Sequence, residues 1–162
     1  PIPLLKDKAS DPQNKIMLKW LKGATTPKSD FGDPIDSDDY ALCLYEDEGG
    51  TDELRTSVVA GHGGQCGNRP CWAENTYGWL FRDSNGSPTG ASVLKLKEGL
   101  TDGAAKILFR GKGGALAMPN LSQLTGTLTV QLHRSGGAPC FEATFSPPFI
   151  LGDGETLKDR AD

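Results

Sequence analysis

The feature that most constrains the fold of this chain is the alternation of apolar and polar residues in short runs. In "KIMLKWL", which begins at Lys15, the residues Ile16, Leu18 and Trp20 share one side and Lys15 and Lys19 the other. Successive side chains of a β-strand point to opposite faces, so this pattern predicts a half-buried strand. Comparable runs occur at residues 39–46, 53–60, 76–83, 92–97, 106–110, 127–134 and 141–146.

Turn-forming residues separate these runs, and the 162-residue chain contains 21 glycines and 11 prolines. The segments "EDEGGTDE" and "HRSGGAPC" place paired glycines between two runs, where a hairpin turn needs positive φ. No segment of ten or more residues has the 3.6-residue period of a helix. We therefore predict an all-β protein: a single antiparallel β-sandwich over residues 1–162, of the immunoglobulin-like or Greek-key type, with about eight to ten strands.

The chain also resembles itself. "LKDKASDPQNKIMLK" at residues 5–19 aligns with "LKEGLTDGAAKILFR" at residues 96–110. Two copies are too few for a solenoid, so this similarity predicts an internal two-fold duplication within one sandwich, with halves at about 5–90 and 91–162. The identical positions are Leu5, Lys6, Asp11, Lys15 and Ile16.

The chain has four cysteines, Cys43, Cys66, Cys71 and Cys140, and an even set in a turn-rich chain is typical of an oxidising compartment. The residues between Cys66 and Cys71 are turn formers, which favours a local disulfide and leaves Cys43 to pair with Cys140. Four cysteines allow three pairings, so the other two stay open. Zinc is disfavoured because there is no CxxC spacing and neither histidine adds a matching ligand pattern.

Charge is unevenly distributed along the chain. Residues 1–28 carry six lysines and two aspartates, whereas residues 29–53 carry ten acidic residues and no basic one. Such complementary segments can orient self-association. No basic stripe is interleaved with aromatic residues, which disfavours nucleic-acid binding, and no apolar stretch is long enough for membrane insertion.

The acidic loop "DFGDPIDSDDY" at residues 30–40 allows two interpretations. Its carboxylates could bind Ca²⁺, which prefers six to eight oxygen ligands, with "GDGE" at residues 152–155 as a further donor. Aspartates also build ordinary turns by accepting hydrogen bonds from nearby backbone, which is the interpretation we favour, and we expect no other cofactor. The candidate ligands are Asp30, Asp33, Asp36, Asp38 and Asp39.

Aromatic residues alternate at Tyr77, Trp79 and Phe81. If exposed, they would form a stacking platform for sugar rings, as in sandwich-type carbohydrate-binding modules. If buried, they would form part of the core, which is the commoner use of such a face.

Several segments together carry a resemblance that covers nearly the whole chain: "KDKASDPQNKIMLKWLKGA", "DFGDP", "DDYALCLY", "CGNRPCW", "GWLFRD", "LKLKEG", "KILFRGKGGAL" and "LKDRAD". The chain resembles a β-rich domain, often C-terminal, that recurs in predicted secreted bacterial proteins of unassigned function. The resemblance implies a secreted or cell-surface location in a bacterium, and it brings no catalytic residue or ligand with it. Because the sequence begins at Pro1, we also expect a module from a longer precursor.

Three functional classes follow. We expect a non-catalytic structural or interaction module, such as a subunit of a surface assembly or filament that associates with itself or with another surface protein. In its sharper form, Ile2, Leu4 and Leu5 of the leader 1–5 form a strand donated to a neighbouring copy. The alternative is a module that binds polysaccharide through its aromatic residues. The third class is a hydrolase with paired carboxylates, which leave no local signature in a sequence, and we rank it last. The sequence also has no GxSxG motif of a catalytic triad, so we expect no enzyme.

Overall fold

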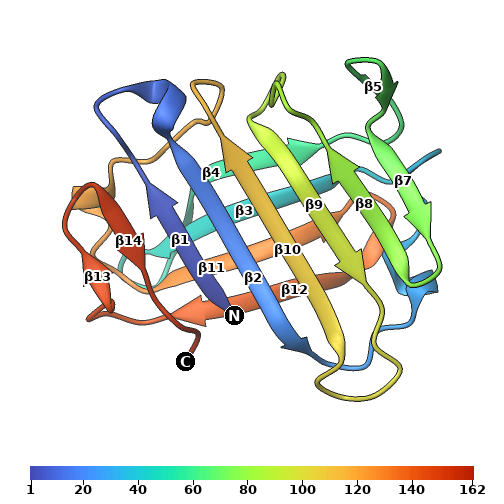
Figure 1. The fold of residues 1–162 in the computed structure, drawn as a ribbon. Coiled ribbons are helices and arrows are strands. Elements are labelled where there is room, and N and C mark those ends of the chain that lie inside the picture. The colour runs from blue at the N-terminus through green and yellow to red at the C-terminus, as the bar shows by residue number, and fades with distance from the viewer.

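The computed structural model describes the backbone of residues 1–162 and every side chain except those of residues 138 and 139. Two antiparallel sheets, one large and one small, pack face to face, and the strands of the small sheet run across those of the large one (Figure 1). This confirms the predicted antiparallel β-sandwich. Every run predicted from alternation forms a strand.

In spatial order, the strands of the large sheet are β13 (Leu151–Gly152), β14 (Thr156–Lys158), β1 (Ile2–Lys6), β2 (Lys15–Gly23), β10 (Ala105–Lys112), β9 (Ala91–Lys97), β8 (Gly78–Arg82) and β7 (Trp72–Asn75). Those of the small sheet are β12 (Gly137–Phe145), β11 (Leu128–Arg134), β3 (Tyr40–Asp47) and β4 (Asp52–Ala60), and β5 (Gln65–Cys66) pairs with β6 (Arg69–Pro70). The helical elements of this backbone are three short 3-10 turns, η1 (Asp11–Gln13), η2 (Lys28–Phe31) and η3 (Leu121–Gln123).

The strands outnumber the eight to ten that were predicted because several are too short to show alternation. β5, β6 and β13 have two residues each and β14 has three. The predicted turns are present at both glycine pairs: Gly49 and Gly50 have φ of 66° and 92° between β3 and β4, and Gly137 has φ of 99° between β11 and β12.

The core lies between the two sheets and is built from the inward positions of each strand. Ile16, Leu18 and Trp20 of β2 are buried as their alternation predicts, while Lys15 and Lys19 lie on the opposite side. The least exposed core side chains come from both sheets. They are Leu5, Leu18, Leu94, Leu96 and Phe109 from the large sheet and Tyr40, Leu42, Leu44, Leu128, Leu132 and Phe145 from the small one.

The leader strand β1 occupies a place in its own sheet, between β14 and β2 (Figure 1). Leu5 stands opposite Leu157 on one side and Ile16 on the other, and it is only 1% exposed. The leader therefore has a place in the sheet of its own chain, and its donation to a neighbouring copy stays a prediction. The sequence did not reveal the neighbour β14, because its three residues give no periodic signal.

The strand order has an approximate two-fold symmetry. Strands β1, β2, β3, β4, β7 and β8 correspond to β9, β10, β11, β12, β13 and β14, respectively. Exchanging each strand for its counterpart reverses the strand order of both sheets and leaves the neighbours unchanged. The registers agree as well: Lys6 faces Lys15 in the β1–β2 pair, and Lys97 faces Lys106 in the β9–β10 pair. These are the positions that align in the sequence. A duplication as the origin of this symmetry stays a prediction.

Candidate functional site: the basic face of the large sheet

The outward positions of the large sheet carry one sign of charge. Six of its strands, β1, β2, β8, β9, β10 and β14, contain ten of the 17 Lys and Arg residues at outward positions and none of the 21 Asp and Glu residues. These ten residues are called the basic face: Lys6, Lys15, Lys19, Arg82, Lys95, Lys97, Lys106, Arg110, Lys112 and Lys158.

Several of these cations stand directly opposite one another. Lys15 of β2 faces Lys6 on one side and Lys112 on the other, which gives a row of three lysines across three strands. Like charges at facing positions destabilise a sheet. Among the described residues, no ion pair involves any member of the basic face. The repulsion is therefore not offset by acidic side chains of the same chain.

A shallow hollow of about 360 Å³ opens within this face. Four of its lining side chains are cationic, and Leu4 and Met17 add an aliphatic wall. A concave site lined by cations concentrates an anionic group, because its positive potential is focused there. The chemistry of the site is therefore electrostatic capture of carboxylate, sulfate or phosphate groups. The four cations are Lys6, Lys15, Arg110 and Lys112.

Sequence reasoning missed the basic face. It identified the lysines of residues 1–28, but not that residues 92–112 repeat the same sign on their outward positions. The available signal was that the polar residues which alternate with buried ones in "KIMLKWL", "VLKLK" and "KILFRGK" are all Lys or Arg. The hydrogen-bonded register then joins these strands into one surface.

The acidic loop at residues 30–40 uses much of its charge within the protein. Asp33 Oδ1 accepts hydrogen bonds from the N–H groups of Ile35 and Asp36, both at 3.1 Å. Asp38 Oδ2 accepts from the Asp33 N–H at 2.7 Å and from Arg134 Nη1 at 3.2 Å. The bonds to backbone N–H groups are the turn roles that the favoured interpretation predicts.

The remaining members of this loop differ. Asp39 Oδ1 accepts the N–H of His62 and contacts its Nδ1, each at 2.7 Å, and these bonds lower the pKa of the Asp39 carboxyl below its ordinary value. Asp36 is exposed, and Asp30 lines a separate hollow. Among the described side chains, no group of three or more His, Cys, Asp or Glu residues is arranged to hold a metal ion. The calcium hypothesis stays a prediction.

The segment "GDGE" also forms a turn. Asp153 Oδ1 accepts the N–H groups of Glu155 and Thr156 at 3.0 and 2.7 Å, and these bonds lower the pKa of Asp153. The carboxylate therefore already has two donors from its own backbone.

The three alternating aromatic residues do not form one exposed platform. Trp79 and Phe81 lie on the inner face of β8 and are 8% and 5% exposed, while Tyr77 is 58% exposed. Tyr77 precedes β8, in the turn after β7, so it does not continue the alternation of the strand. The favoured interpretation as core is therefore confirmed for Trp79 and Phe81. The alternative stacking surface of Tyr77, Trp79 and Phe81 is wrong as a set, and Tyr77 is its exposed member.

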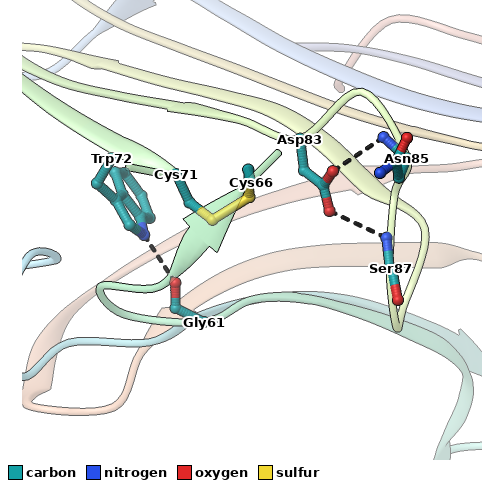
Figure 2. The surroundings of a disulfide bond; sticks show 7 residues. All are labelled: Gly61, Cys66, Cys71, Trp72, Asp83, Asn85 and Ser87. Atoms are coloured by element: carbon teal, nitrogen blue, oxygen red, sulfur yellow. Dashed lines mark hydrogen bonds between the residues drawn. A yellow bond between two sulfur atoms is a disulfide. The ribbon is translucent and has the colours of Figure 1, made fainter. Parts of the chain in front are cut away.

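The predicted Cys66–Cys71 disulfide is confirmed, with the two Cα atoms 4.8 Å apart. Figure 2 shows it beside Trp72, whose Nε1 donates to the carbonyl of Gly61 at 2.7 Å. Nearby, the carboxylate of Asp83 accepts the N–H groups of Asn85 and Ser87, at 2.9 and 3.0 Å (Figure 2). These groups border a second hollow of about 340 Å³. The buried carboxylate of Asp83 already accepts these two backbone N–H groups, so its role is to stabilise the loop that follows β8.

The predicted Cys43–Cys140 disulfide is wrong, because both cysteines are free. Cys43 is on β3 and Cys140 on β12, and β11 lies between these two strands. Two strand spacings are about 9 to 10 Å, whereas a disulfide joins Cα atoms no more than about 7 Å apart. Burial raises the pKa of both thiols, which disfavours the reactive thiolate.

Both histidines have polar partners. His62 contacts Asp39, and His133 Nε2 lies 2.7 Å from Gln131 Oε1. Among the described side chains, neither histidine is hydrogen-bonded to a serine, threonine or cysteine. No helix of the described chain is long and apolar enough to cross a membrane.

The chain was compared with known protein families, with curated proteins and with solved structures. None of the three comparisons found a match.

Proposed function

We propose that this chain is a non-catalytic, extracytoplasmic interaction module that docks a negatively charged macromolecule on the basic face. One observation carries the proposal: ten cations share one face of a sheet whose strands contribute no acidic residue to it. A surface of one sign speeds encounter with an oppositely charged partner and selects against partners of like charge.

The arrangement favours binding over a role in solubility alone. Mixed charges keep a surface soluble without placing like charges at facing positions, whereas Lys6, Lys15 and Lys112 form an uninterrupted row. An anionic partner would offset this repulsion with its own negative charge. The row of lysines therefore destabilises the free protein and favours a complex with such a partner.

The extracytoplasmic part of the proposal has two supports. The Cys66–Cys71 disulfide is typical of oxidising compartments. The similarity to a domain of secreted bacterial proteins points the same way. In such a setting the module would belong to a cell-surface assembly.

The test is binding to immobilised dextran sulfate, measured by biolayer interferometry over a range of salt concentrations. Wild type is expected to bind at low salt, and Lys15→Glu/Lys112→Glu to lose at least about tenfold in affinity, because attraction at two positions becomes repulsion. The matched control is Arg69→Glu/Arg160→Glu, which changes the net charge equally at exposed positions off the basic face. The control is expected to stay within about twofold of wild type.

Equal losses in the two double variants would contradict the proposal, since binding would then follow net charge alone. So would a wild type that fails to bind at low salt. Neutral dextran completes the design. Binding to it that is lost in Tyr77→Ala would favour the carbohydrate-binding alternative instead.

A further inference from the structure

We propose that the partner of the basic face is a second copy of this chain, which presents its acidic hairpin. The acidic hairpin is the turn between β3 and β4, with the exposed residues Asp47, Glu48, Asp52 and Glu53. This inference rests on the proposed function, because it takes the basic face as the docking surface and names what docks there.

The acidic hairpin is shaped to reach a partner. Gly49 and Gly50 form its tip, and a Cβ added to either glycine would have no heavy atom within 4 Å. The tip therefore projects from the body of the protein. β4 is also an edge strand of the small sheet, so one flank of the hairpin has no neighbouring strand.

The acidic residues in and beside the hairpin fall into two groups, those that form ion pairs within the chain and those that do not. Glu46 is buried and accepts hydrogen bonds from the N–H groups of Thr125 and Gly126, at 2.7 and 2.8 Å. Arg55 forms ion pairs with Glu46, Glu48 and Glu53.

Asp47 and Asp52 form no ion pair among the described residues, although Asp47 Oδ1 accepts the N–H of Gly50 at 2.6 Å. They stand directly opposite one another. Two facing carboxylates repel each other in the same way as the facing lysines of the basic face. Each array lacks the countercharge that the other supplies.

The two arrays also match in spacing. Asp47 and Asp52 are a cross-strand pair, and so are Lys15 and Lys112. Facing residues of antiparallel strands have Cβ atoms about 4.5 to 5.5 Å apart in either case. The pair of carboxylates can therefore meet a pair of ammonium groups at the edge of the 360 Å³ hollow.

An apolar contact accompanies the charges. Leu54 follows the acidic residues on β4 and is 54% exposed. The hollow offers the aliphatic side chains of Leu4 and Met17. Burial of a leucine against them would add to the attraction between charges.

A second copy is favoured over an unrelated anion because the chain carries its own complement. All 21 acidic residues lie outside the six strands of the basic face, and the net charge of the whole chain is only −4. Copies therefore repel weakly as whole molecules, while their opposed surfaces attract. The hairpin and the basic face belong to different sheets. The contact therefore either is made twice in a two-fold dimer or repeats into a ring or an open chain.

The experiment is sedimentation velocity of the whole chain at about 20 mM and about 500 mM salt, since charge attraction is screened at the higher value. Wild type is expected to form oligomers at low salt and to dissociate at high salt. Lys15→Glu/Lys112→Glu and Asp47→Lys/Asp52→Lys should each be monomeric when alone. Their mixture should associate, because one variant retains the native hairpin and the other the native face.

A wild type that stays monomeric at low salt would overturn this inference, and so would a hairpin variant that assembles like wild type. Dextran sulfate separates the two proposals. If wild type binds dextran sulfate but remains a monomer, the basic face is a docking surface and its partner is not a second copy. If Lys15→Glu/Lys112→Glu binds dextran sulfate as well as wild type does, both proposals are wrong. Circular dichroism checks the fold of each variant, and Lys15→Gln and Asp47→Asn replace any variant that fails to fold.

Discussion

The outer faces of the two sheets both carry polar residues, but they differ in how these residues are charged and bonded. The large sheet exposes ten cations to solvent, with no acid among them. The small sheet presents Cys43, Gln131 and Glu142 in one row across β3, β11 and β12. There the polar groups bond to each other: Gln131 Nε2 donates to Glu142 Oε2 at 2.5 Å, and Gln131 Oε1 contacts His133 Nε2.

The comparison shows that exposure to solvent does not by itself demand charge of one sign. The small sheet stays polar with an amide, an imidazole and a carboxylate that bond to one another within the monomer. Apart from the ammonium group of Lys97, which lies over the ring of Tyr77, the basic face leaves its cationic groups to solvent or to a partner. This difference is the reason for proposing the large sheet as the binding surface.

The largest expected effect comes from the inner side of the large sheet. Leu5→Ala should lower the free energy of unfolding by about 3 kcal/mol, because it removes buried methyl groups between two neighbouring strands. Leu4→Ala, at the next position on the half-buried outer side, should cost less than about 1 kcal/mol. Urea denaturation measures both. Equal costs would mean that Leu5 is not buried as described.

Strand β1 also shows what a sequence reveals of such a fold. Alternation in "KIMLKWL" and "KILFR" is enough to predict two central strands and their inward residues. The leader is recognisable as apolar, but its place is not, because that place depends on pairing with β14 near the other end of the chain. A three-residue strand leaves no local signal, and non-local pairing is decided by the whole sheet.

A smaller effect is expected from the disulfide, whose cysteines border the 340 Å³ hollow and not the 360 Å³ hollow of the basic face. Cys66→Ser/Cys71→Ser should lower the free energy of unfolding by about 2 kcal/mol, because the loop that the disulfide closes is short. Binding to dextran sulfate should be unchanged under conditions where the variant is folded. A parallel loss of binding would show that the basic face depends on this loop, and the two regions would no longer be independent.

Exchanging one residue between the two faces tests the comparison directly. Lys15→Gln should raise the free energy of unfolding by about 0.2 to 1 kcal/mol at low salt, because it interrupts the row from Lys6 to Lys112. The same variant should bind dextran sulfate more weakly. The gain in stability should shrink in high salt, as screening reduces the repulsion.

The reciprocal variant is Gln131→Lys, which adds a cation to the small sheet opposite Cys43 and Glu142. It should leave affinity for dextran sulfate near that of wild type, because one isolated cation beside a carboxylate does not make a surface of one sign. An increase as large as the loss in Lys15→Gln would show that the polyanion responds to net charge and not to the arrangement of the basic face.

The candidate site is harder to predict than the fold, for a physical reason. The acidic residues cluster within one stretch of sequence and so attract attention first, yet Asp33, Asp38 and Asp39 bond within the protein. The cations are scattered from Lys6 to Lys158 and become one surface only through strand register. A charge cluster that is local in sequence is often explained by local turns, whereas one assembled by a sheet is visible only in three dimensions.

The smallest expected effect concerns the acidic loop, whose charge is satisfied internally. The N–H and imidazole of His62 hold the pKa of Asp39 below its ordinary value. The ionised carboxylate therefore adds stability that is fully present above the unfolded-state pKa and is lost as the pH falls through the lower pKa of the folded state. Asp39→Asn should reduce the loss of stability on acidification, by a small amount because the side chains of Asp39 and His62 are 45% and 50% exposed.

The measurement is the midpoint of urea unfolding at a series of pH values from neutral to about 3, with Asp36→Asn as the control, since Asp36 lies in the same loop without contacting His62. If Asp36→Asn flattens the pH profile as much as Asp39→Asn does, the effect belongs to the total charge of the loop and not to the bonds with His62. The acidic loop would then resemble the basic face, as an array of unrelieved like charges, and it would compete with the acidic hairpin as the segment that docks on a second copy.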